Sequence, residues 1–440
     1  MRRMRLVPLI AATYFMVSGG PYGIEDILGS AGYGKALLIL ALFPFLWSFP
    51  TALMLGELTS AIPSEGGFYV WVRRAMGPFW GYQEAWLSLT ASIFDMAIYP
   101  TLFVLYLGKL LPGWTAGSRG IIWELALVAI CCLWNLCGAP AVGEGSVTLF
   151  ALLLSPFAVL IVLCFLRSPH LQHHTTAVAG GTISTAIIVA LWNYMGWDNA
   201  STVAEEVENP RRNYPFAMIA AAALVAISYI LPVLAISHAG ISVDQFTTGS
   251  WTDAARMLGG PLLAGAVVVC GMISGLGMLN ALVLSYTRLP MVLAQDGMLP
   301  QWLALKNKRG VPWVAIIICS IAWAGALGFR FEELISIDLI LYGSSLLLEF
   351  VALAVLRFKE PDLPRPFCAG NLFMACTLGV PPALLIGYVM YSARDERMAH
   401  MPALLFGFLV ALAGPIFYWI SRKRWGQKRI GESALAPSGD

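Results

Sequence analysis

The sequence is poor in charge: only 12% of its 440 residues are Asp, Glu, Lys or Arg, whereas 58% are hydrophobic and the mean hydropathy is +0.74. A water-soluble domain of this size needs a much larger charged share, so a soluble protein is excluded. The chain also lacks a polar segment long enough to form a separate domain. Together with a net charge of only +2, this argues against nucleic-acid binding. We therefore expect the lipid bilayer to be the solvent of this chain.

Motifs of catalysis and metal binding are missing as well. There is no H-E-x-x-H motif and no nucleophile with a matching base, so we expect no enzyme and no cofactor. The eight cysteines offer no exterior pair for a disulfide and are expected to be packing residues. His170, His173 and His174 cluster in a predicted exterior loop without the further ligands of a metal site, so we predict a solvated polar loop there.

Apolar runs of about 20 residues, long enough to cross a bilayer as helices, recur along nearly the whole chain. The runs are apolar on all sides, which excludes the alternating strands of a membrane barrel. We therefore predict an all-α polytopic membrane protein. Its twelve predicted spans are residues 6–31, 35–61, 79–111, 120–138, 146–166, 182–204, 213–237, 261–288, 312–328, 333–356, 374–393 and 401–421.

The basic residues predict the orientation, because Lys and Arg near helix ends stay on the cytoplasmic side. With both termini inside, 19 of the 27 Lys and Arg fall on cytoplasmic segments. We therefore expect a multi-pass protein of the cell membrane (inner or plasma membrane) with both termini cytoplasmic.

Two predicted spans are interrupted, the first at Ser18-Gly19-Gly20-Pro21 and the sixth at Tyr194-Met195-Gly196-Trp197-Asp198. A broken helix exposes backbone groups and two half-helix ends that can hold ions and substrate, although Gly and Pro also produce simple kinks. The breaks stand five helices apart, so we predict a single transmembrane domain with two inverted five-helix repeats, residues 1–166 and 182–356. Residues 374–421 would form two peripheral helices, and 422–440 a cytoplasmic tail. This pattern indicates a secondary transporter.

Three segments carry a family resemblance: Glu57-Leu58 with Pro63, Gly66-Gly67 and Tyr69; Glu205-Glu206 with Asn209-Pro210, Arg212 and Pro215; and Arg288 with Asp296-Gly297 and Leu299-Pro300. They resemble the signatures of the amino acid-polyamine-organocation transporter superfamily. The Gly77 to Glu84 segment, Asp95 with Tyr99-Pro100, and Trp192-Asn193 with Trp197-Asp198 are most similar to its branch of polyamine uptake and L-type amino acid transporters. The resemblance implies the LeuT-type fold and proton-coupled uptake of polyamines or related amines.

Three departures from the family pattern bear on the cargo and the coupling ion. Pro21 removes a backbone N–H that most amino acid permeases of the superfamily offer to a substrate carboxylate. Asn280 stands where the similar polyamine transporters carry an acidic residue, which leaves smaller amines and amino acids open. The fifth span lacks the lysine that some proton-coupled relatives place near the sodium site, so the resemblance does not settle the coupling ion. A proton is the expected coupling ion, and sodium is not excluded.

Carboxylic acids in the spans point to cationic cargo. We identified Glu25, Asp26, Glu84, Asp95, Asp198 and Glu349, with no Lys or Arg near a span centre. An ionised carboxylate in hydrocarbon costs several kcal/mol, so each acid must be protonated, hydrated, placed at a half-helix N-terminus or matched by a mobile cation. Protons and a cationic substrate are the obvious candidates.

Asp95 is the first candidate for the ammonium group or proton, with Tyr99 one turn further on the same face. Glu25 follows the first break, where capping of the half-helix is an equal alternative. Trp197 and Tyr342 are candidate cation–π walls. The predicted substrate site comprises Gly19, Gly20, Tyr22, Glu25, Asp95, Tyr99, Asn193, Trp197, Asp198 and Tyr342.

Proton or ion coupling is assigned to Asp95, Glu25 and Asp198, with Ser274 and Asn280 as weaker ligands. Glu57 and Glu84 lie nearer the cytoplasmic side, where we expect them to pair with Arg73, Arg74 or Arg288 in a closing gate. The expected function is proton-coupled import of a small amine or amino acid by alternating access. An amine or amino acid exchanger and a transporter-like nutrient receptor are the alternatives, and the oligomeric state is open.

Overall fold

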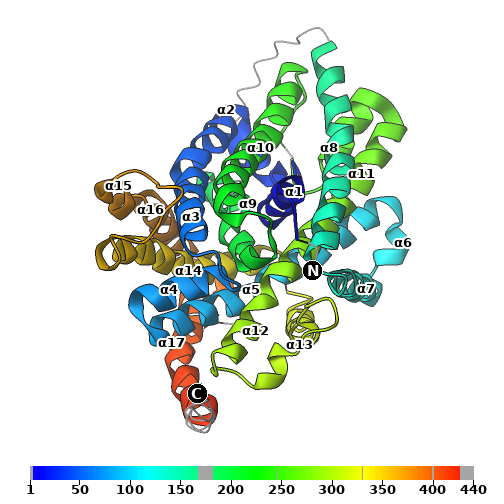
Figure 1. The fold of residues 1–440 in the computed structure, drawn as a ribbon. Coiled ribbons are helices and arrows are strands. Elements are labelled where there is room, and N and C mark those ends of the chain that lie inside the picture. The colour runs from blue at the N-terminus through cyan, green and yellow to red at the C-terminus, as the bar shows by residue number, and fades with distance from the viewer. Residues whose placement is uncertain (1–2, 167–181, 245, 330, 399–400, 427–440) are drawn as a thin grey trace, which may run out of the picture.

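The computed structural model describes residues 3–166, 182–244, 246–329, 331–398 and 401–426, and within these ranges the chain is almost entirely helical (Figure 1). The predicted histidine loop at 170–174 and tail residues 427–440 lie outside them. All eight cysteines are free, and five are buried or half-buried. Helices dominate because a backbone without access to water must satisfy its hydrogen bonds within its own segment.

The first half of the chain contains α1 (Leu6–Val17), α2 (Glu25–Phe43), the π-helical turn η1 (Pro44–Ser48), α3 (Phe49–Ala61), α4 (Gly67–Met76), α5 (Pro78–Leu110), α6 (Pro112–Thr115), α7 (Ser118–Asn135) and α8 (Ala139–Leu166). Of these, α4 was not predicted. It is amphipathic, with Phe68, Trp71 and Val72 buried while Arg73 and Arg74 are more exposed.

The second half contains α9 (Ile183–Asn193), η2 (Trp197–Thr202), η3 (Ala204–Glu206), α10 (Pro210–His238), α11 (Trp251–Tyr286), α12 (Arg288–Gln295), η4 (Gln301–Ala304), α13 (Trp313–Ala324), α14 (Phe331–Lys359), α15 (Leu372–Thr377), α16 (Val380–Ser392), η5 (Ala393–Asp395), α17 (Ala403–Ser421) and η6 (Arg422–Gly426). The strands β1 (Arg397–Met398) and β2 (Met401–Pro402) pair antiparallel before α17.

Within the described ranges, nine helices are long and apolar enough to cross a membrane. The three predicted spans without such a helix are the first, the sixth and the ninth. The first and sixth are interrupted, and the ninth contains only the twelve residues of α13. Two of the long stretches are divided by a glycine with positive φ: Gly32 (φ 68°) between the predicted first and second spans, and Gly260 (φ 74°) at the predicted start of the eighth.

The centre of the molecule is formed by α5, which packs against both α11 and α14. Small residues allow α11 to approach closely: a Cβ added to Gly275 would lie 2.6 Å from the Tyr99 carbonyl oxygen, and one on Gly271 would lie 2.5 Å from the Tyr106 ring. Helix α1 packs against α8, α10 and α11, and α2 against α9. Figure 1 shows α15 and α16 at one edge of the molecule, where they pack on α14, while α17 packs on α5.

Candidate functional site

The first break lies between α1 and α2, where the sequence predicts it. Residues 18–24 are not helical, and Gly20 (φ 72°) and Gly23 (φ 91°) adopt a conformation that other residues rarely take. The Ser18 hydroxyl accepts a hydrogen bond from the Gly20 amide at 3.0 Å. The Pro21 carbonyl accepts one from the Trp251 indole at 2.6 Å. The break is therefore an ordered structure with its own polar contacts, which a simple kink would not need.

Glu25 begins α2 and is fully buried. Its Oε2 accepts a hydrogen bond from the Gly23 amide at 2.7 Å. Its Oε1 accepts from the Tyr106 hydroxyl at 2.7 Å and from the Gly249 amide at 3.1 Å. Glu25 thus binds an amide of the break itself rather than a free amide in the first turn of α2. Tyr106 is a partner that sequence reasoning missed because it is 81 residues away.

Residues 248–251 are attached to the first break at two further points. The Thr248 hydroxyl donates to Asp26 Oδ2 at 2.6 Å. The Trp251 indole binds the Pro21 carbonyl, as described above. With the Gly249 amide on Glu25, three successive contacts hold this segment over the start of α2.

The second break follows α9 at residues 194–196 and touches the first directly. A Cβ on Gly196 (φ 96°) would lie 2.4 Å from the carbonyl oxygen of Met16, so only glycine permits this approach. Asn193 bridges the breaks by donating its side-chain amide to the Gly23 carbonyl at 3.3 Å, and its own carbonyl accepts from the Tyr229 hydroxyl at 2.7 Å. The two interruptions therefore form one contiguous region.

Asp198 faces α14 from this region. Tyr342 donates its hydroxyl to Asp198 Oδ1 and accepts the Gly196 amide at 2.9 Å, so one side chain from α14 holds both parts of the break. Asp198 and Tyr342 are each 2% exposed. Trp197, predicted as a wall, is fully buried and donates its indole N–H to the Tyr194 carbonyl at 2.7 Å.

Asp95 on α5 lies close to the same region. Its Oδ1 accepts the Tyr99 hydroxyl at 2.5 Å, as the spacing on one helix face predicts, and its Oδ2 accepts the Tyr286 hydroxyl at 3.3 Å. Tyr286 also accepts the Asn199 side-chain amide at 3.5 Å, which connects Asp95 to η2. The three helical elements α5, α11 and η2 thus meet at Asp95, and Tyr286 was missed by sequence reasoning.

Asp338 on α14 lies in the predicted tenth span but is not among the predicted site residues. It is fully buried, and both of its oxygens lack a hydrogen-bond partner among the described residues. It interacts electrostatically with Asp95 and Asp198. Its signal in the sequence is that it is an acid within the predicted tenth span. It also lies one helical turn before Tyr342, on the same face.

The weaker candidates on α11 fall in different places. Ser274 lies against the first break: a Cβ on Gly19 would be 2.1 Å from its hydroxyl, which has no partner in the described chain. Asn280 instead accepts the Asn135 side-chain amide at 2.9 Å, which joins α11 to α7. Tyr22 donates its hydroxyl to the Val267 carbonyl at 2.7 Å, and Gly20 packs against Leu153 of α8.

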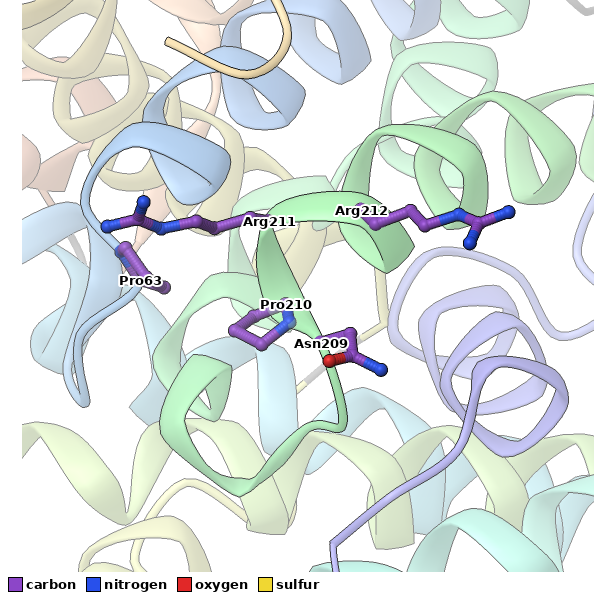
Figure 2. Close-up of a pocket in the computed structure, with 5 residues that line it drawn as sticks. All are labelled: Pro63, Asn209, Pro210, Arg211 and Arg212. Carbon is purple, nitrogen blue, oxygen red and sulfur yellow. The ribbon is translucent and has the colours of Figure 1, made fainter. Parts of the chain in front are cut away.

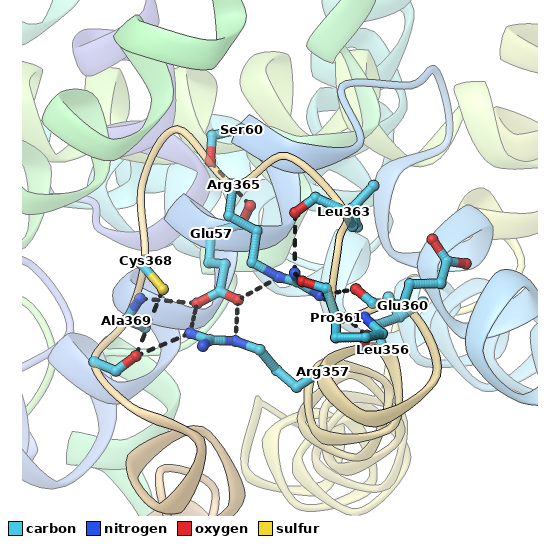
Figure 3. Close-up of polar contacts among 11 residues, drawn as sticks. Glu57, Ser60, Leu356, Arg357, Glu360, Pro361, Leu363, Arg365, Cys368 and Ala369 are labelled. Carbon is cyan, nitrogen blue, oxygen red and sulfur yellow. Dashed lines mark hydrogen bonds and ion pairs between the residues drawn. The ribbon is translucent and has the colours of Figure 1, made fainter.

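The predicted pairing of the gate residues is wrong for Glu57. Its carboxylate binds Arg357 at 2.5 and 2.6 Å and Arg365 at 3.2 Å, and it accepts the Ala369 amide at 2.8 Å (Figure 3). Glu57 lies on the face of α3 that meets the end of α14, whereas the arginines of α4 lie on a separate amphipathic helix. The sequence spacing does not reveal this packing.

The pairing predicted for Glu84 is also wrong. Its Oε1 accepts hydrogen bonds from Ser88 and Ser345, each at 2.9 Å, and Glu84 forms no ion pair within the described ranges. Glu84 is fully buried between α5 and α14, where the arginines of α4 do not reach it.

The arginines expected to bind these acids pair elsewhere. Arg73 binds Asp296, Arg74 binds Glu360 at 2.6 Å, and Arg288 binds Glu206 at 2.9 Å. The Arg288–Glu206 and Arg73–Asp296 pairs connect the sequence segments that carry the family resemblance. The Tyr69 hydroxyl adds a further bond to Asp296 at 2.8 Å.

Two more contacts lie on the side of the molecule that carries these ion pairs. Lys306 binds Glu65 at 3.0 Å, and burial raises the pKa of Glu65 although Lys306 opposes that shift. The Met4 amide donates to the Glu206 carbonyl at 2.8 Å, so the start of the chain is attached to the Glu206–Arg288 pair.

Two cavities open at this surface. One of about 500 Å³ is lined by Pro63 and residues 209–212, and Figure 2 shows Arg211 and Arg212 extending in opposite directions rather than converging on a common ligand. Another of about 720 Å³ is lined by residues that include Arg3, Glu144 and Lys308. Glu25, Asp198 and Asp338 are at most 2% exposed and Asp95 is 4% exposed, so this conformation is closed around these four acids. The described residues contain no group of side chains that could hold a metal ion.

Comparison with known proteins places this architecture in a family. The amino acid permease family model matches residues 10–421. A polyamine transporter of Arabidopsis thaliana is 32% identical over 437 residues, covering 96% of this chain and 87% of the relative. A polyamine transporter of Oryza sativa subsp. japonica is 31% identical, with 96% and 80% covered. The serine/threonine exchanger SteT of Bacillus subtilis is 25% identical, with 94% of each chain covered.

These matches extend over nearly all of the apolar helices and include both breaks. They confirm the resemblance drawn from the three motifs, and they confirm that the chain is a transporter and not an enzyme. The chain therefore belongs to the amino acid permease family and is a multi-pass membrane transporter.

Proposed function

We propose that this transporter imports a small amine, a polyamine or an amino acid, across the plasma membrane by proton symport with alternating access. The observation that carries the proposal is the arrangement of Asp95 and Asp198. Both are buried beside the contiguous breaks and held by tyrosine hydroxyls, and in the described part of the chain neither forms an ion pair. A substrate ammonium group and a proton are the cations that can balance them.

The names of the relatives support an amine cargo. Two plant relatives at 31% and 32% identity are named polyamine transporters. Pro21 at the first break supports the same assignment, because it removes a donor that a substrate carboxylate would use. Asp338, which lies near Asp95 and Asp198, adds a third acid to the region and favours a cargo with more than one positive charge.

We assign the substrate site to the residues around the two breaks. Gly19, Gly20 and Tyr22 contribute the first break, and Asn193, Trp197 and Asp198 the second. Asp95, Tyr99 and Tyr342 complete the site from α5 and α14. Ser274, against Gly19, is retained as an ion ligand, and Glu25 as a group that holds the first break in place. Asn280 is given a structural role because it binds Asn135.

The proposed architecture is a LeuT-type arrangement of twelve membrane helices with both termini cytoplasmic. Its inverted repeats are residues 1–166 and 182–356, with 374–421 peripheral. The glycine divisions at 32 and 260 and the two touching breaks support this arrangement. The cytoplasmic gate then consists of the Arg288–Glu206, Arg73–Asp296 and Lys306–Glu65 pairs, which must separate before substrate is released inside.

The function is tested with the purified protein in liposomes. Uptake of radiolabelled spermidine and of radiolabelled serine is measured with and without an imposed pH gradient, acidic outside. We expect spermidine to accumulate only with the gradient. Uptake that ignores the gradient would remove proton coupling from the proposal.

Exchange is the second candidate, because the relative from Bacillus subtilis is named a serine/threonine exchanger. An exchanger requires internal substrate, whereas a symporter fills empty liposomes. Serine uptake that appears only in liposomes preloaded with serine would favour exchange.

A further inference from the structure

Two buried acids, Glu84 on α5 and Glu349 on α14, have no part in the substrate site described above. Both are fully buried. Glu84 lies eleven residues before Asp95, which corresponds to about 16 Å along a helix, and only six residues after the start of α5. Glu349 precedes Arg357, the first basic residue at the end of α14, by eight residues. Both acids therefore lie between the substrate site and the proposed cytoplasmic end.

A stripe of polar side chains on α14 lies between these acids and the site. On α14, Tyr342, Ser345 and Glu349 are spaced three and four residues apart, which places them on one helix face. The Ser345 hydroxyl lies 2.9 Å from Glu84 Oε1 and 2.7 Å from the Ser88 hydroxyl. At the other end Tyr342 donates to Asp198. Glu349 interacts electrostatically with both Asp198 and Glu84, and Tyr342 with Glu349.

The acids of the stripe have unfilled hydrogen-bonding capacity. Both oxygens of Glu349 and the Oε2 of Glu84 are without a hydrogen-bond partner in the part of the chain that the structure describes. A buried acceptor without a donor is costly, and an ionised one more so. A carboxyl that carries a proton supplies the missing donor itself. Two such groups beside each other are therefore suited to hold and pass a proton.

The other charged groups around α5 and α14 are engaged elsewhere or belong to the site. They are Arg73 and Arg74 of α4, bound to Asp296 and Glu360; Glu57 of α3, bound to Arg357 and Arg365; and Asp95, Asp198 and Asp338 at the breaks. Tyr286 of α11 faces Asp95. No basic side chain of the described residues forms an ion pair with Glu84 or Glu349.

A proton fits this stripe and an amine does not. Glu84, Ser88, Ser345 and Glu349 are each at most 1% exposed, and they line neither of the cavities described above. A transported amine would need space beside the carboxylates, whereas a proton needs only an oxygen to receive it.

We propose that Glu349 and Glu84, with the Tyr342 and Ser345 hydroxyls, form a proton relay that carries the symported proton from Asp198 toward the cytoplasm. This inference rests on the proposed function. In this conformation Tyr342 donates to Asp198 and Glu349 has no hydrogen-bond partner among the described residues, so the transfer begins when the Tyr342 hydroxyl turns from Asp198 to Glu349. The acid form of Asp198 then gives its proton to the Tyr342 oxygen while the Tyr342 hydroxyl proton passes to Glu349. Glu349 then turns toward the unpartnered Oε2 of Glu84 and protonates it, while the Ser345 hydroxyl holds Glu84 in place through Oε1. The proton leaves Glu84 when the cytoplasmic side opens. Each step breaks one O–H bond and forms another, and no oxidant or reductant is involved.

The test uses liposomes containing a pH-sensitive dye and purified full-length protein, with radiolabelled spermidine outside. Wild type is compared with Glu349→Gln and Glu84→Gln, which keep the side-chain shape but cannot carry a proton as an acid. We expect both variants to lose at least about tenfold of spermidine-dependent proton influx and of gradient-driven accumulation, as for removal of a proton-transfer group. Spermidine counterflow at equal pH needs no net proton movement and continues. Glu349→Asp restores part of the proton influx.

The matched control is Glu124→Gln, which alters another buried acid in a different helix, α7, away from the stripe. It should transport protons and spermidine like wild type. Wild-type proton influx in both Glu349→Gln and Glu84→Gln would overturn the relay. A change in spermidine affinity with coupling intact would overturn it too, because the acids would then bind substrate. Absence of proton influx in wild type itself would instead refute the proposed symport.

Discussion

Glu57 supports a strong prediction about stability. Its carboxylate is 1% exposed and is shared by Arg357, 12% exposed, and Arg365, 10% exposed, while it also accepts the Ala369 amide (Figure 3). Truncation to alanine leaves two nearly buried guanidinium groups without their anion. Breaking a buried ion pair by removing one partner costs about 3–5 kcal/mol. We expect Glu57→Ala to reach this range.

A second ion pair at the end of α14 provides the matched control. Arg74 and Glu360 are 43% and 31% exposed, and exposed pairs contribute only about 0.2–1 kcal/mol. Glu360→Ala should therefore barely change stability. The assay is the fraction of detergent-solubilised protein that remains monodisperse on gel filtration after heating over a series of temperatures.

A double-mutant cycle completes the experiment. In the Glu57→Ala background, Arg357→Ala should cost less than it does in wild type, because that arginine has already lost its partner. If Glu57→Ala shifts the melting temperature no more than Glu360→Ala does, the argument from burial is wrong. If the two substitutions at 57 and 357 are additive, the pair is not coupled as the geometry requires.

Three further predictions concern the site and its surroundings. Asp95→Asn should raise the KM for spermidine by about 10–150-fold, the equivalent of ~1.5–3 kcal/mol for a hydrogen bond to a charged group, as read from concentration-dependent uptake. Gly196→Ala should abolish recovery of folded protein, since its Cβ would meet a backbone carbonyl at 2.4 Å, whereas Gly387→Ala, with no atom within 4 Å, should be recovered in full. The hydrogen bond from Arg74 lowers the pKa of Glu360 below its usual 4.5. The small stabilisation from this pair is therefore present above pH 4.5 and is lost as the pH falls through the lowered value. The difference in melting temperature between wild type and Glu360→Gln should vanish at low pH.

The breaks could be predicted from the sequence because their cause is local. Gly19-Gly20-Pro21 and Gly196 cannot continue a membrane helix without interruption, and Asp95 with Tyr99 is a pair separated by one helical turn. Such features depend on residues adjacent in the sequence or one turn apart. The structure therefore contains both of them where they were expected.

The partners of the charged groups could not be predicted in the same way. Glu57 binds Arg357, 300 residues away, and Glu25 binds Tyr106 and Gly249 across two other helices. These pairings depend on which helix faces meet, and apolar runs without a strong polar face do not specify that. Asp338 is different, because its position inside the predicted tenth span is visible in the sequence.

The four hydrogen bonds from Thr248, Gly249 and Trp251 to the first break and the start of α2 affect how this side of the molecule can open. This segment begins α11, but it is bonded to α2 and Pro21 and is separated from the membrane part of α11 by Gly260. A Cβ at Gly260 would have no atom within 4 Å, so no neighbouring element packs against the chain on that side of the residue. We therefore expect residues 248–259 to move as one body with the first break and the start of α2, with Gly260 as the joint about which they separate from the rest of α11.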